Sequence, residues 1–478
     1  MSKQDQFLAE TVELLGPSGL TRDPDLITPW LTDWRGVYTG AALALASPDT
    51  VDQLASLITL CARYNVPVVP QGGNSGMVGG ATPDESGNAL LLSMRRMNRI
   101  RRLDVEARQI VCEAGVILQN LHDAVAAQGL RFPLTLGGKG SATVGGLVST
   151  NAGGTQVLRH GCMRAQVLGL EAVLADGSRF DGLTVLKKDN RGFDLKQLLI
   201  GSEGTLGIVT AATLALLPAI AGRAVLWAGV PTIQAARALL LHCEARAGQA
   251  LEGFEIIPAH SLAAVLDHLP NSRSPLAGEH AWHALIELVA DEQSIDGLPG
   301  LAESLLESAL DLGLLDDATI AANETQADAF WLLRDSIASA ERALGPALQH
   351  DISVPVEKMP DFVTFASREV ENRFPGTKAI AFGHLGDGNV HFHVLAPAGA
   401  VHGVWQRGAG RPITSFVYDL VTRWGGSISA EHGIGQSKRE ELQRLGDPAR
   451  LAMMAAVKQA LDPHGLLNPG KLVPLAPH

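Results

Sequence analysis

Three histidines stand close together in one short stretch, Ala-Phe-Gly-His-Leu-Gly-Asp-Gly-Asn-Val-His-Phe-His-Val. The flanking segments 378–382 and 390–394 are apolar or β-branched and short enough for strands, and the glycines and the Asp-Gly step between them predict a tight turn. His384 would then end one strand, whereas His391 and His393 would open the next and share one face, because strand side chains alternate. The sequence therefore predicts a hairpin that carries three imidazoles.

A second strand-like run, 426–430, leads to Glu431 and His432 at the start of the glycine-rich turn 433–435. Two histidines and one glutamate at the ends of rigid elements suit a divalent metal with an open coordination position, as in catalytic zinc sites. Histidines near turns are also commonly exposed or hydrogen-bonded to a neighbour, which is the alternative to ligation. A His-Glu-x-x-His helix and a Cys-x-x-Cys pair are both missing from the sequence, which excludes the common zinc-protease and zinc-finger patterns. The residues indicate a metal site or an acid–base site without specifying the reaction.

The composition is that of an acidic protein with a large apolar core. The chain has 478 residues, of which 46% are hydrophobic and 18% charged, and its formal net charge is −12. This length allows two or three domains, and the charge balance argues against a nucleic-acid partner, which needs clustered Lys and Arg. An acidic protein that handles anionic substrates must supply positive charge locally, and Arg334 and a metal ion are the candidates.

The cysteines and the N-terminus bear on the compartment. Cys61, Cys112, Cys162 and Cys243 are widely spaced, which is typical of buried thiols in a reducing environment. Residues 1–16 lack the basic start and apolar region of a signal peptide, and no apolar stretch reaches the ~18–20 residues that a membrane helix needs. We therefore expect a cytoplasmic protein without a membrane span.

Two glycine-rich stretches are candidates for binding a phosphate-containing ligand. The first, 71–80, follows a predicted helix over 49–64 and a predicted strand over 66–70. Glycines let backbone N–H groups approach a ligand closely and form anion-binding nests, for which a pyrophosphate is the natural guest. The Rossmann Gly-x-Gly-x-x-Gly pattern does not occur in a strand-to-helix context. The stretch 465–471 resembles a P-loop but has Leu472 where Ser or Thr is required, so we reject that assignment.

The second glycine-rich stretch is 133–154, after a predicted helix over 117–128. Small residues recur in it at about helical spacing, which would let a helix approach a large planar ligand or another backbone. Consecutive glycines are also compatible with a flexible loop. The small residues are Gly145, Gly146, Ser149, Ala152 and Gly153.

The pattern changes from about residue 222. Alternating apolar runs are separated by Ala- and Leu-rich helical stretches, which predicts an α+β domain with an antiparallel sheet. One apolar helical face is predicted over 327–344, with Arg334 at its edge, where an arginine usually extends to water. Beyond residue 433 the chain is predicted to be mostly helical, over 438–445 and 448–461.

Several long segments of the sequence resemble the vanillyl-alcohol-oxidase-type flavoproteins. Within that superfamily the chain is most similar to D-2-hydroxyglutarate dehydrogenase and its relatives that act on D-lactate and other D-2-hydroxy acids. The similarity covers nearly the whole chain, and its matches are long and contiguous. The matching segments are 71–80, 138–154, 188–190, 201–210, 383–393, 429–435 and 461–471.

The resemblance implies FAD as the cofactor and an α+β fold. A two-part FAD-binding domain would span 1–221, an antiparallel-sheet substrate- and metal-binding domain 222–430, and a helical segment that returns to the flavin 431–478. The glycine-rich stretches would hold the FAD pyrophosphate, Glu203, Gly207 and Ile208 would lie along the adenosine end, and Asn468 would reach the flavin ring. The other residues that we predict to bind FAD are Gly72, Gly73, Asn74, Ser75, Gly76, Met77, Gly138, Ser141, Gly145, Gly146 and Asn151.

The resemblance also implies a reaction. His384, His391 and Glu431 would bind a divalent metal, for which we expect zinc, and leave positions for the hydroxyl and carboxylate of a 2-hydroxy acid. Arg334 would hold the substrate carboxylate. His432 would take the hydroxyl proton as general base, and hydride would pass from Cα to flavin N5.

Three residues depart from the pattern of the hydroxyglutarate enzymes. His393 stands where Asn is typical, Ala338 where Thr is typical, and Gln349 where a Lys usually helps to hold substrate. A charge-assisted hydrogen bond contributes ~1.5–3 kcal/mol, so these changes should weaken recognition of a second carboxylate. We favour D-2-hydroxyglutarate, with D-lactate or another D-2-hydroxy acid as the alternative. We keep His393 and Gln349 as predicted substrate-binding residues, and His350 as a possible source of a replacement contact.

Two other classes of function stay open at this point. A zinc hydrolase would use the His/His/Glu site but leave the glycine-rich stretches without a role, and a non-catalytic flavin-binding module would use only those stretches. Among enzymes, the sequence does not separate an oxidase from a dehydrogenase. The resemblance favours a dehydrogenase that passes electrons to a quinone or an electron-transfer flavoprotein, and a homodimer is the default expectation.

Overall fold

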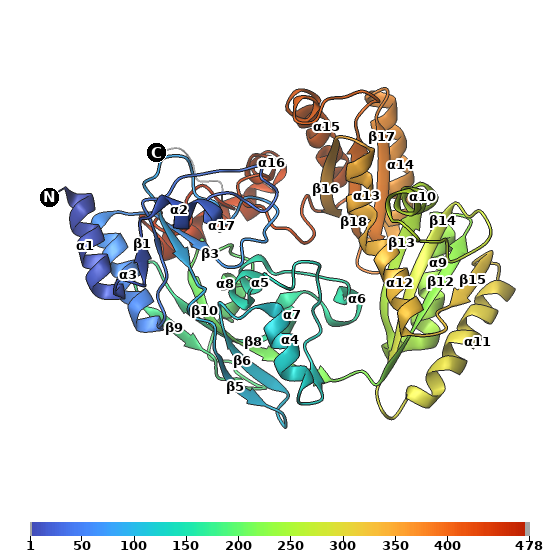
Figure 1. The fold of residues 1–478 in the computed structure, drawn as a ribbon, viewed down its shortest axis with the longest axis horizontal. Coiled ribbons are helices and arrows are strands. Elements are labelled where there is room, and N and C mark those ends of the chain that lie inside the picture. Colours follow the sequence, from blue (N-terminus) through green and yellow to red (C-terminus); the bar gives the residue numbers. More distant parts are fainter. Residues whose placement is uncertain (1, 474–478) are drawn as a thin grey trace. The chain divides into compact units, whose positions relative to one another are not determined.

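The computed structural model describes residues 2–473, and the chain forms two compact units (Figure 1). Unit 1 comprises residues 1–154, 160–218 and 431–478, and unit 2 comprises residues 155–159 and 219–430. The chain therefore leaves unit 1 after its second sheet and returns to it with its C-terminal part.

The first sheet of unit 1 has the strand order β1-β2-β4-β3, with β2, β4 and β3 parallel. Helix α3 begins at the predicted cap, because the Thr50 side chain accepts a hydrogen bond from the N–H of Gln53, and it ends at Asn65 in the left-handed conformation. Apolar residues of α1 and α3 form one buried cluster with this sheet. The elements are α1 (Lys3–Leu15), β1 (Leu20–Thr21), α2 (Pro24–Ile27), β2 (Ala44–Ala46), α3 (Val51–Tyr64), β3 (Val68–Gln71) and β4 (Leu90–Ser93).

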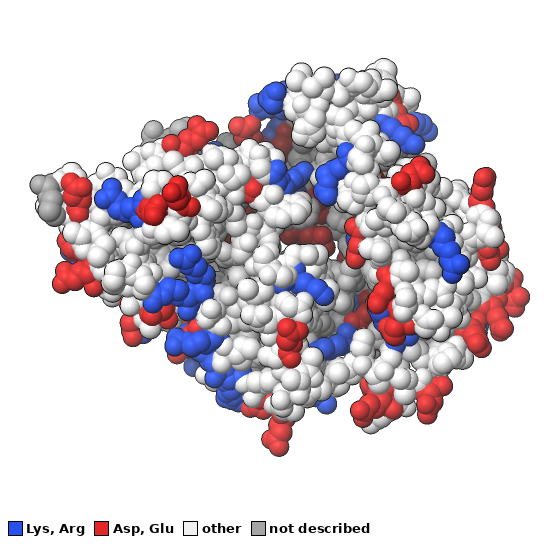
Figure 2. Space-filling model, in the orientation of Figure 1, with Lys and Arg blue, Asp and Glu red and all other residues white. Residues whose placement is uncertain are grey.

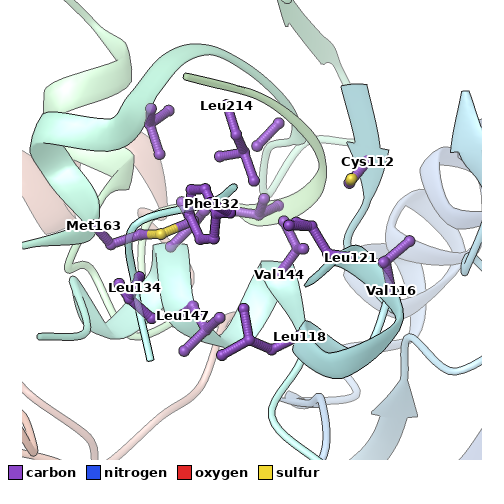
Figure 3. Packing of buried hydrophobic residues seen from close by; sticks show 14 of the residues in the cluster. Cys112, Val116, Leu118, Leu121, Phe132, Leu134, Val144, Leu147, Met163 and Leu214 are labelled. Carbon is purple, nitrogen blue, oxygen red and sulfur yellow. The ribbon is translucent and has the colours of Figure 1, made fainter. Parts of the chain in front are cut away.

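The second sheet of unit 1 is antiparallel, in the order β5-β6-β10-β8-β9. Its core packs Leu118 and Leu121 of α4 against Phe132 and Val144 (Figure 3). The elements are β5 (Ile100–Asp104), β6 (Gln109–Glu113), α4 (Leu118–Ala126), β7 (Leu130–Arg131), α5 (Val144–Thr150), α7 (Met163–Gln166), β8 (Val167–Val173), β9 (Arg179–Gly182), α8 (Lys196–Leu199), β10 (Ile208–Ala215) and β11 (Leu217–Pro218), with β7 pairing β11. The short helix α6 (Val157–His160) lies between α5 and α7 in the chain, and all but its last residue belong to unit 2.

The C-terminal segment completes unit 1 with α16 (Arg439–Leu445) and α17 (Pro448–Leu461). The buried Lys458 of α17 donates hydrogen bonds to the carbonyl oxygens of Thr205 and Leu467, at 2.8 and 2.9 Å, and pairs with Asp462. Leu467 forms a parallel bridge with Val68 of β3. These contacts hold the last described residues against the strand that precedes the first glycine-rich loop.

Unit 2 is built on an antiparallel sheet in the order β15-β12-β14-β13-β17-β18-β16. Trp227 is fully buried beside Phe330 of α12 and donates its indole N–H to Nδ1 of the buried His283. The elements are β12 (Gly222–Val230), α9 (Ile233–Ala247), β13 (Leu251–Pro258), α10 (Ala259–His268), β14 (Trp282–Ala290), α11 (Leu298–Asp311), β15 (Asp317–Ile320), α12 (Glu324–Asp335), α13 (Ile337–Leu344), β16 (Ala347–Ser353), α14 (Met359–Arg373), β17 (Lys378–His384), β18 (Asn389–Leu395) and α15 (Val404–Arg423).

The predicted α+β fold class is confirmed, and three local predictions are wrong. The run 426–430 is not a strand, because a single bridge from Ser427 to Ser353 is its one ladder contact. Helix α5 ends at Thr150, since Asn151 turns left-handed, so Ala152 and Gly153 lie beyond it. The predicted single helical face over 327–344 is divided at Ser336 between α12 and α13.

Charged side chains are interspersed on the viewed face of the molecule (Figure 2). Acidic groups outnumber basic ones in the chain, with 50 Asp and Glu against 38 Lys and Arg. Among the described residues, none of the helices is both long enough and apolar enough to cross a membrane. All four cysteines are free thiols, and Cys61, Cys112 and Cys243 are buried.

Candidate active site

The sheet of unit 2 collects polar side chains on one face through its strand register. Residues directly opposite in antiparallel strands point to the same face. His384 of β17 pairs with Asn389 of β18 and with Glu255 of β13, while His391 pairs with Asp351 of β16. The predicted hairpin is confirmed. Side chains on the shared face are Glu255, Gln349, Asp351, His384, Asn389, His391 and His393.

His384 is held by a buried carboxylate that sequence reasoning missed. Its Nδ1 donates to Glu255 Oε1 at 2.5 Å, and the other oxygen of Glu255 accepts from Arg334 Nε and Nη2 at 3.0 and 2.9 Å. Burial opposes ionisation of Glu255, but the charges of Arg334 and His384 outweigh it and hold the pKa of Glu255 at about 2. Nδ1 is thereby fixed as the donor, which leaves Nε2, 3.3 Å from Arg334 Nη2, as the atom that can bind a metal.

His391 lies beside His384, with 5.6 Å between the ring centroids. Burial, together with the charges of His384 and Arg334, lowers the pKa of His391 well below its usual range. An imidazole that stays neutral keeps a lone pair for a metal. On the same face, the amide of the buried Asn389 donates to Asp351 Oδ1 at 2.9 Å, while its Oδ1 has no partner among residues 2–473.

His393 is paired with a second carboxylate that the sequence did not reveal. Its Nδ1 donates to Glu341 Oε2 of α13 at 2.5 Å, and Ser261 donates to the other oxygen of Glu341 at 3.2 Å. All three residues are buried. Gln349 sits directly opposite His393 in the register. The expected replacement contact from His350 is wrong, because His350 points to the other face, toward the Phe392 carbonyl and Thr414 on α15.

Glu431 and His432 follow Ala430, the last residue of unit 2, so the peptide chain ties them to the end of that unit. Two sets of side chains offer metal-ligating atoms that all lie within 4.8 Å of one another. One is His384, His391 and Glu431, and the other is Asp351, Glu431 and His432. Two imidazole nitrogens and a carboxylate oxygen form a donor set that fits a divalent zinc-like ion. The metal, and the role of His432 as base, remain predictions.

The two glycine-rich stretches of unit 1 pack against each other through positions where only glycine fits. A Cβ on Gly73 would lie 1.7 Å from the Ser141 carbonyl oxygen, and one on Gly72 would lie 2.3 Å from Thr143 Oγ1. A Cβ on Gly145, at the start of α5, would also be too close to its neighbour, at 2.6 Å from Ala114 Cβ. The close approach leaves backbone amides, rather than side chains, to face a ligand.

Buried polar atoms without partners surround these loops. Gln71 Oε1, Thr143 Oγ1 and Asn468 Oδ1 make no hydrogen bond within residues 2–473. Such atoms are rare in folded proteins unless something else satisfies them. Together with the glycine cradle, they fit a large polar cofactor such as FAD.

The other residues predicted to bind FAD are spread along the same unit. Asn468 donates through Nδ2 to the Gly80 and Glu203 carbonyl oxygens at 2.9 and 2.8 Å, and the Glu203 carboxylate accepts from the N–H groups of Ile434 and Gly435, both at 2.7 Å. Asn151 caps α5 and accepts from the N–H of Arg164. Contact with FAD remains a prediction for all of them. Asn74, Ser75, Gly76 and Met77 lie in the loop after β3, and Gly138 and Ser141 lie in the loop before α5. Gly146 lies in the first turn of α5, Gly207 directly precedes β10, and Ile208 is the first residue of β10.

Comparison with known proteins decides the family. The family described as FAD linked oxidases, C-terminal domain, matches residues 221–472, and the FAD binding domain family matches residues 42–181. The chain belongs to the FAD-linked oxidase family. Its structure resembles p-cresol methylhydroxylase with substrate bound, with a TM-score of 0.75 at 15% identity over 98% of this chain and 96% of that one. The vanillyl-alcohol-oxidase-type fold prediction is thereby confirmed.

Curated members of this family align with the FAD-linked oxidase chain over most of its length. The mitochondrial D-2-hydroxyglutarate dehydrogenase of Bos taurus is 38% identical over 97% of this chain and 82% of its own. That of Arabidopsis thaliana is 36% identical over 97% of this chain and 80% of its own. The D-2-hydroxyglutarate dehydrogenase of Xanthomonas citri pv. viticola is 33% identical over 95% of this chain and 94% of its own.

Proposed function

We propose that this chain is an FAD- and divalent-metal-dependent dehydrogenase that oxidises a D-2-hydroxy acid to the 2-oxo acid, with D-2-hydroxyglutarate the favoured substrate. The observation that carries the proposal is the pair of imidazoles, His384 and His391, on one sheet face with Arg334 beside them, in a chain whose family binds FAD. The names of the bovine, plant and bacterial relatives support the substrate.

FAD and a divalent metal would supply complementary chemistry. FAD, when bound, supplies a hydride acceptor at N5. A divalent metal, when bound, supplies a Lewis acid that lowers the pKa of the substrate hydroxyl. Zinc is our choice because the donor set is two imidazoles and one carboxylate.

The residues of the chain would prepare the substrate to lose a proton from its hydroxyl group and a hydride from its Cα. His432 takes the hydroxyl proton, and the Cα hydrogen leaves with its electron pair as hydride, so that the C–O single bond becomes a carbonyl. Glu255 holds His384 in one tautomer and orientation. Arg334 supplies the positive charge for the substrate carboxylate, although two of its nitrogens already donate to Glu255.

The distal part of the substrate distinguishes D-2-hydroxyglutarate from the alternative, which is D-lactate or another D-2-hydroxy acid. Gln349 stands where a Lys helps to hold substrate in the enzymes that the chain resembles, and His393 stands where Asn is typical and is paired with Glu341. This part of the sheet therefore lacks a free lysine charge for a second carboxylate. A relative from Schizosaccharomyces pombe, 32% identical, is named a putative D-lactate dehydrogenase.

We also propose the cellular setting. Electrons would pass to a quinone or an electron-transfer flavoprotein, the chain would form a homodimer, and the cytoplasm is the compartment that its own sequence favours. Several of the relatives are named mitochondrial, which makes fractionation of the native protein the direct check on the compartment.

Steady-state oxidation with an artificial dye as electron acceptor tests the proposal. We expect turnover of D-2-hydroxyglutarate, D-malate or D-lactate. The matching L-acid should have a kcat/KM at least about 100-fold lower, because it cannot place its hydroxyl on the metal and its carboxylate on Arg334 while its Cα hydrogen faces the flavin. Equal rates with both enantiomers, or turnover of none of the acids by flavin-loaded protein, would overturn it.

A further inference from the structure

Lys471 is a buried lysine in the turn that follows α17. The residue is 4% exposed. No hydrogen bond or ion pair joins its Nζ to another of residues 2–473. By contrast, the equally buried Lys458 in the same unit is satisfied by two carbonyl oxygens and Asp462. An unpaired buried charge is costly and persists when another group compensates it.

The charged groups around Lys471 compensate its charge only from a distance, because neither nearby carboxylate makes an ion pair or hydrogen bond with its Nζ. Asp84 and Glu203 attract it and Arg439 repels it, but both carboxylates have other partners. Glu203 is occupied by the N–H groups of Ile434 and Gly435, and Asp84 by the N–H and hydroxyl of Ser86. Burial lowers the pKa of Lys471 to about 8, so the group still carries its charge at neutral pH.

The turn that carries Lys471 is built into the first glycine-rich loop. Asn468 donates its N–H to the Val68 carbonyl before the loop and its side-chain amide to the Gly80 carbonyl at the end of the loop. Leu472 donates its N–H to the Gly435 carbonyl at 3.0 Å. Asn468 and Leu472 both have positive φ, 43° and 52°. Asn adopts this left-handed conformation readily, whereas it is strained for Leu, so the contacts of the turn must hold Leu472 in place.

We propose that Lys471 binds an anionic group of FAD, and that this ammonium, with the unpartnered Asn468 Oδ1 three residues earlier, forms one polar clamp on the cofactor. Two parts of FAD carry such charge: the pyrophosphate, and the pyrimidine side of the flavin ring once the ring is reduced. A cation there favours whichever state bears the negative charge. The inference rests on FAD binding and is independent of which hydroxy acid is oxidised.

Replacement of Lys471 by Met, with Arg as the conservative variant and the exposed Lys378→Met as control, tests the clamp. The readouts are the Kd of FAD for deflavinated protein, the midpoint potential measured with redox dyes in the absence of any hydroxy acid, and the melting temperature of apoprotein and holoprotein. We expect Lys471→Met to weaken FAD binding at least tenfold or to shift the potential to more negative values, and Lys471→Arg to restore most of the loss.

The three readouts distinguish binding of the FAD pyrophosphate, binding of the reduced flavin ring, and a purely structural role of Lys471. A weaker Kd with an unchanged potential assigns the pyrophosphate, and a lowered potential assigns the reduced ring. Apoprotein of Lys471→Met should melt no lower than wild type, because an unpaired charge has been removed, while the FAD-induced rise in melting temperature shrinks. The proposal would be overturned if Lys471→Met had a Kd for FAD within twofold of wild type and a midpoint potential equal to that of wild type within error. It would also be overturned if the substitution lowered the stability of the apoprotein alone.

Discussion

The glycine-rich region of unit 1 and the histidine-rich sheet face of unit 2 build their sites in opposite ways. In unit 1 the site is formed by closely packed backbone, since Gly72, Gly73 and Gly145 are each in contact with another segment that leaves no room for a Cβ. In unit 2 the site is formed by side chains, since the Nδ1 atoms of His384 and His393 are each held by a buried carboxylate oxygen at 2.5 Å. A backbone site is sensitive to added volume, whereas a side-chain site is sensitive to loss of one partner.

The largest effect should follow from added volume in the backbone site. Gly73→Ala places a Cβ 1.7 Å from the Ser141 carbonyl oxygen, so the two loops must separate. We expect purified protein with most of its FAD lost and activity reduced accordingly, measured as the ratio of flavin to protein absorbance. Gly137→Ala, where the added Cβ meets nothing within 4 Å, is the matched control and should keep its flavin.

Removal of a metal ligand should come next. His391→Ala deletes one of the two imidazoles but leaves the loops of unit 1 intact, so the flavin spectrum should stay while activity falls by more than about 100-fold. Metal content by plasma mass spectrometry should drop in parallel. His402→Ala, at an exposed position, should change neither quantity. Full activity of His391→Ala would remove His391 from the site.

Glu255→Gln tests the orienting carboxylate. The change removes the charge that holds His384 and Arg334 together, and partners of this kind typically contribute 10–100-fold in metal affinity or activity. The control is Glu252→Gln on the same strand, equally buried and paired with Arg159 at 2.8 Å. Equal effects of the two substitutions would show that loss of a buried ion pair, rather than orientation of the site, is responsible.

Elements specified by local sequence signals could be predicted, whereas residues brought together by tertiary pairing could not. The hairpin and α17 (Pro448–Leu461) could be predicted because turn glycines, helix periodicity and Pro at a helix start are local signals. Glu255 was missed because it lies 129 residues before His384, on a strand interrupted by Gly253 and a bulge, and meets it only through β13–β17 pairing. Glu341 was missed because the helix breaks at Ser336, so that α13 runs in a new direction. The apolar periodicity of the sequence does not predict this break.

The smallest expected effect is a change of KM that should differ between substitutions on the two faces of β16 and β18. His393→Asn alters the site face and should change KM for a dicarboxylic D-2-hydroxy acid by about tenfold, in a direction that reports whether His393 helps or hinders the second carboxylate. His350→Asn alters the opposite face and should leave KM within about twofold, while the lost hydrogen bonds lower the unfolding free energy by ~1 kcal/mol. Kinetics and urea denaturation measure both. An equal change of KM in the two variants would contradict the register assignment.

The most direct test of the central claim is an anaerobic titration of the visible flavin band with D-2-hydroxyglutarate, D-lactate and D-malate, before and after EDTA treatment. We predict that at least one acid bleaches the band, that EDTA abolishes the bleaching without releasing FAD, and that added zinc restores it. A band that no acid bleaches in metal-replete protein would contradict the dehydrogenase proposal. Bleaching that survives complete metal removal would contradict the role given to His384, His391 and Glu431.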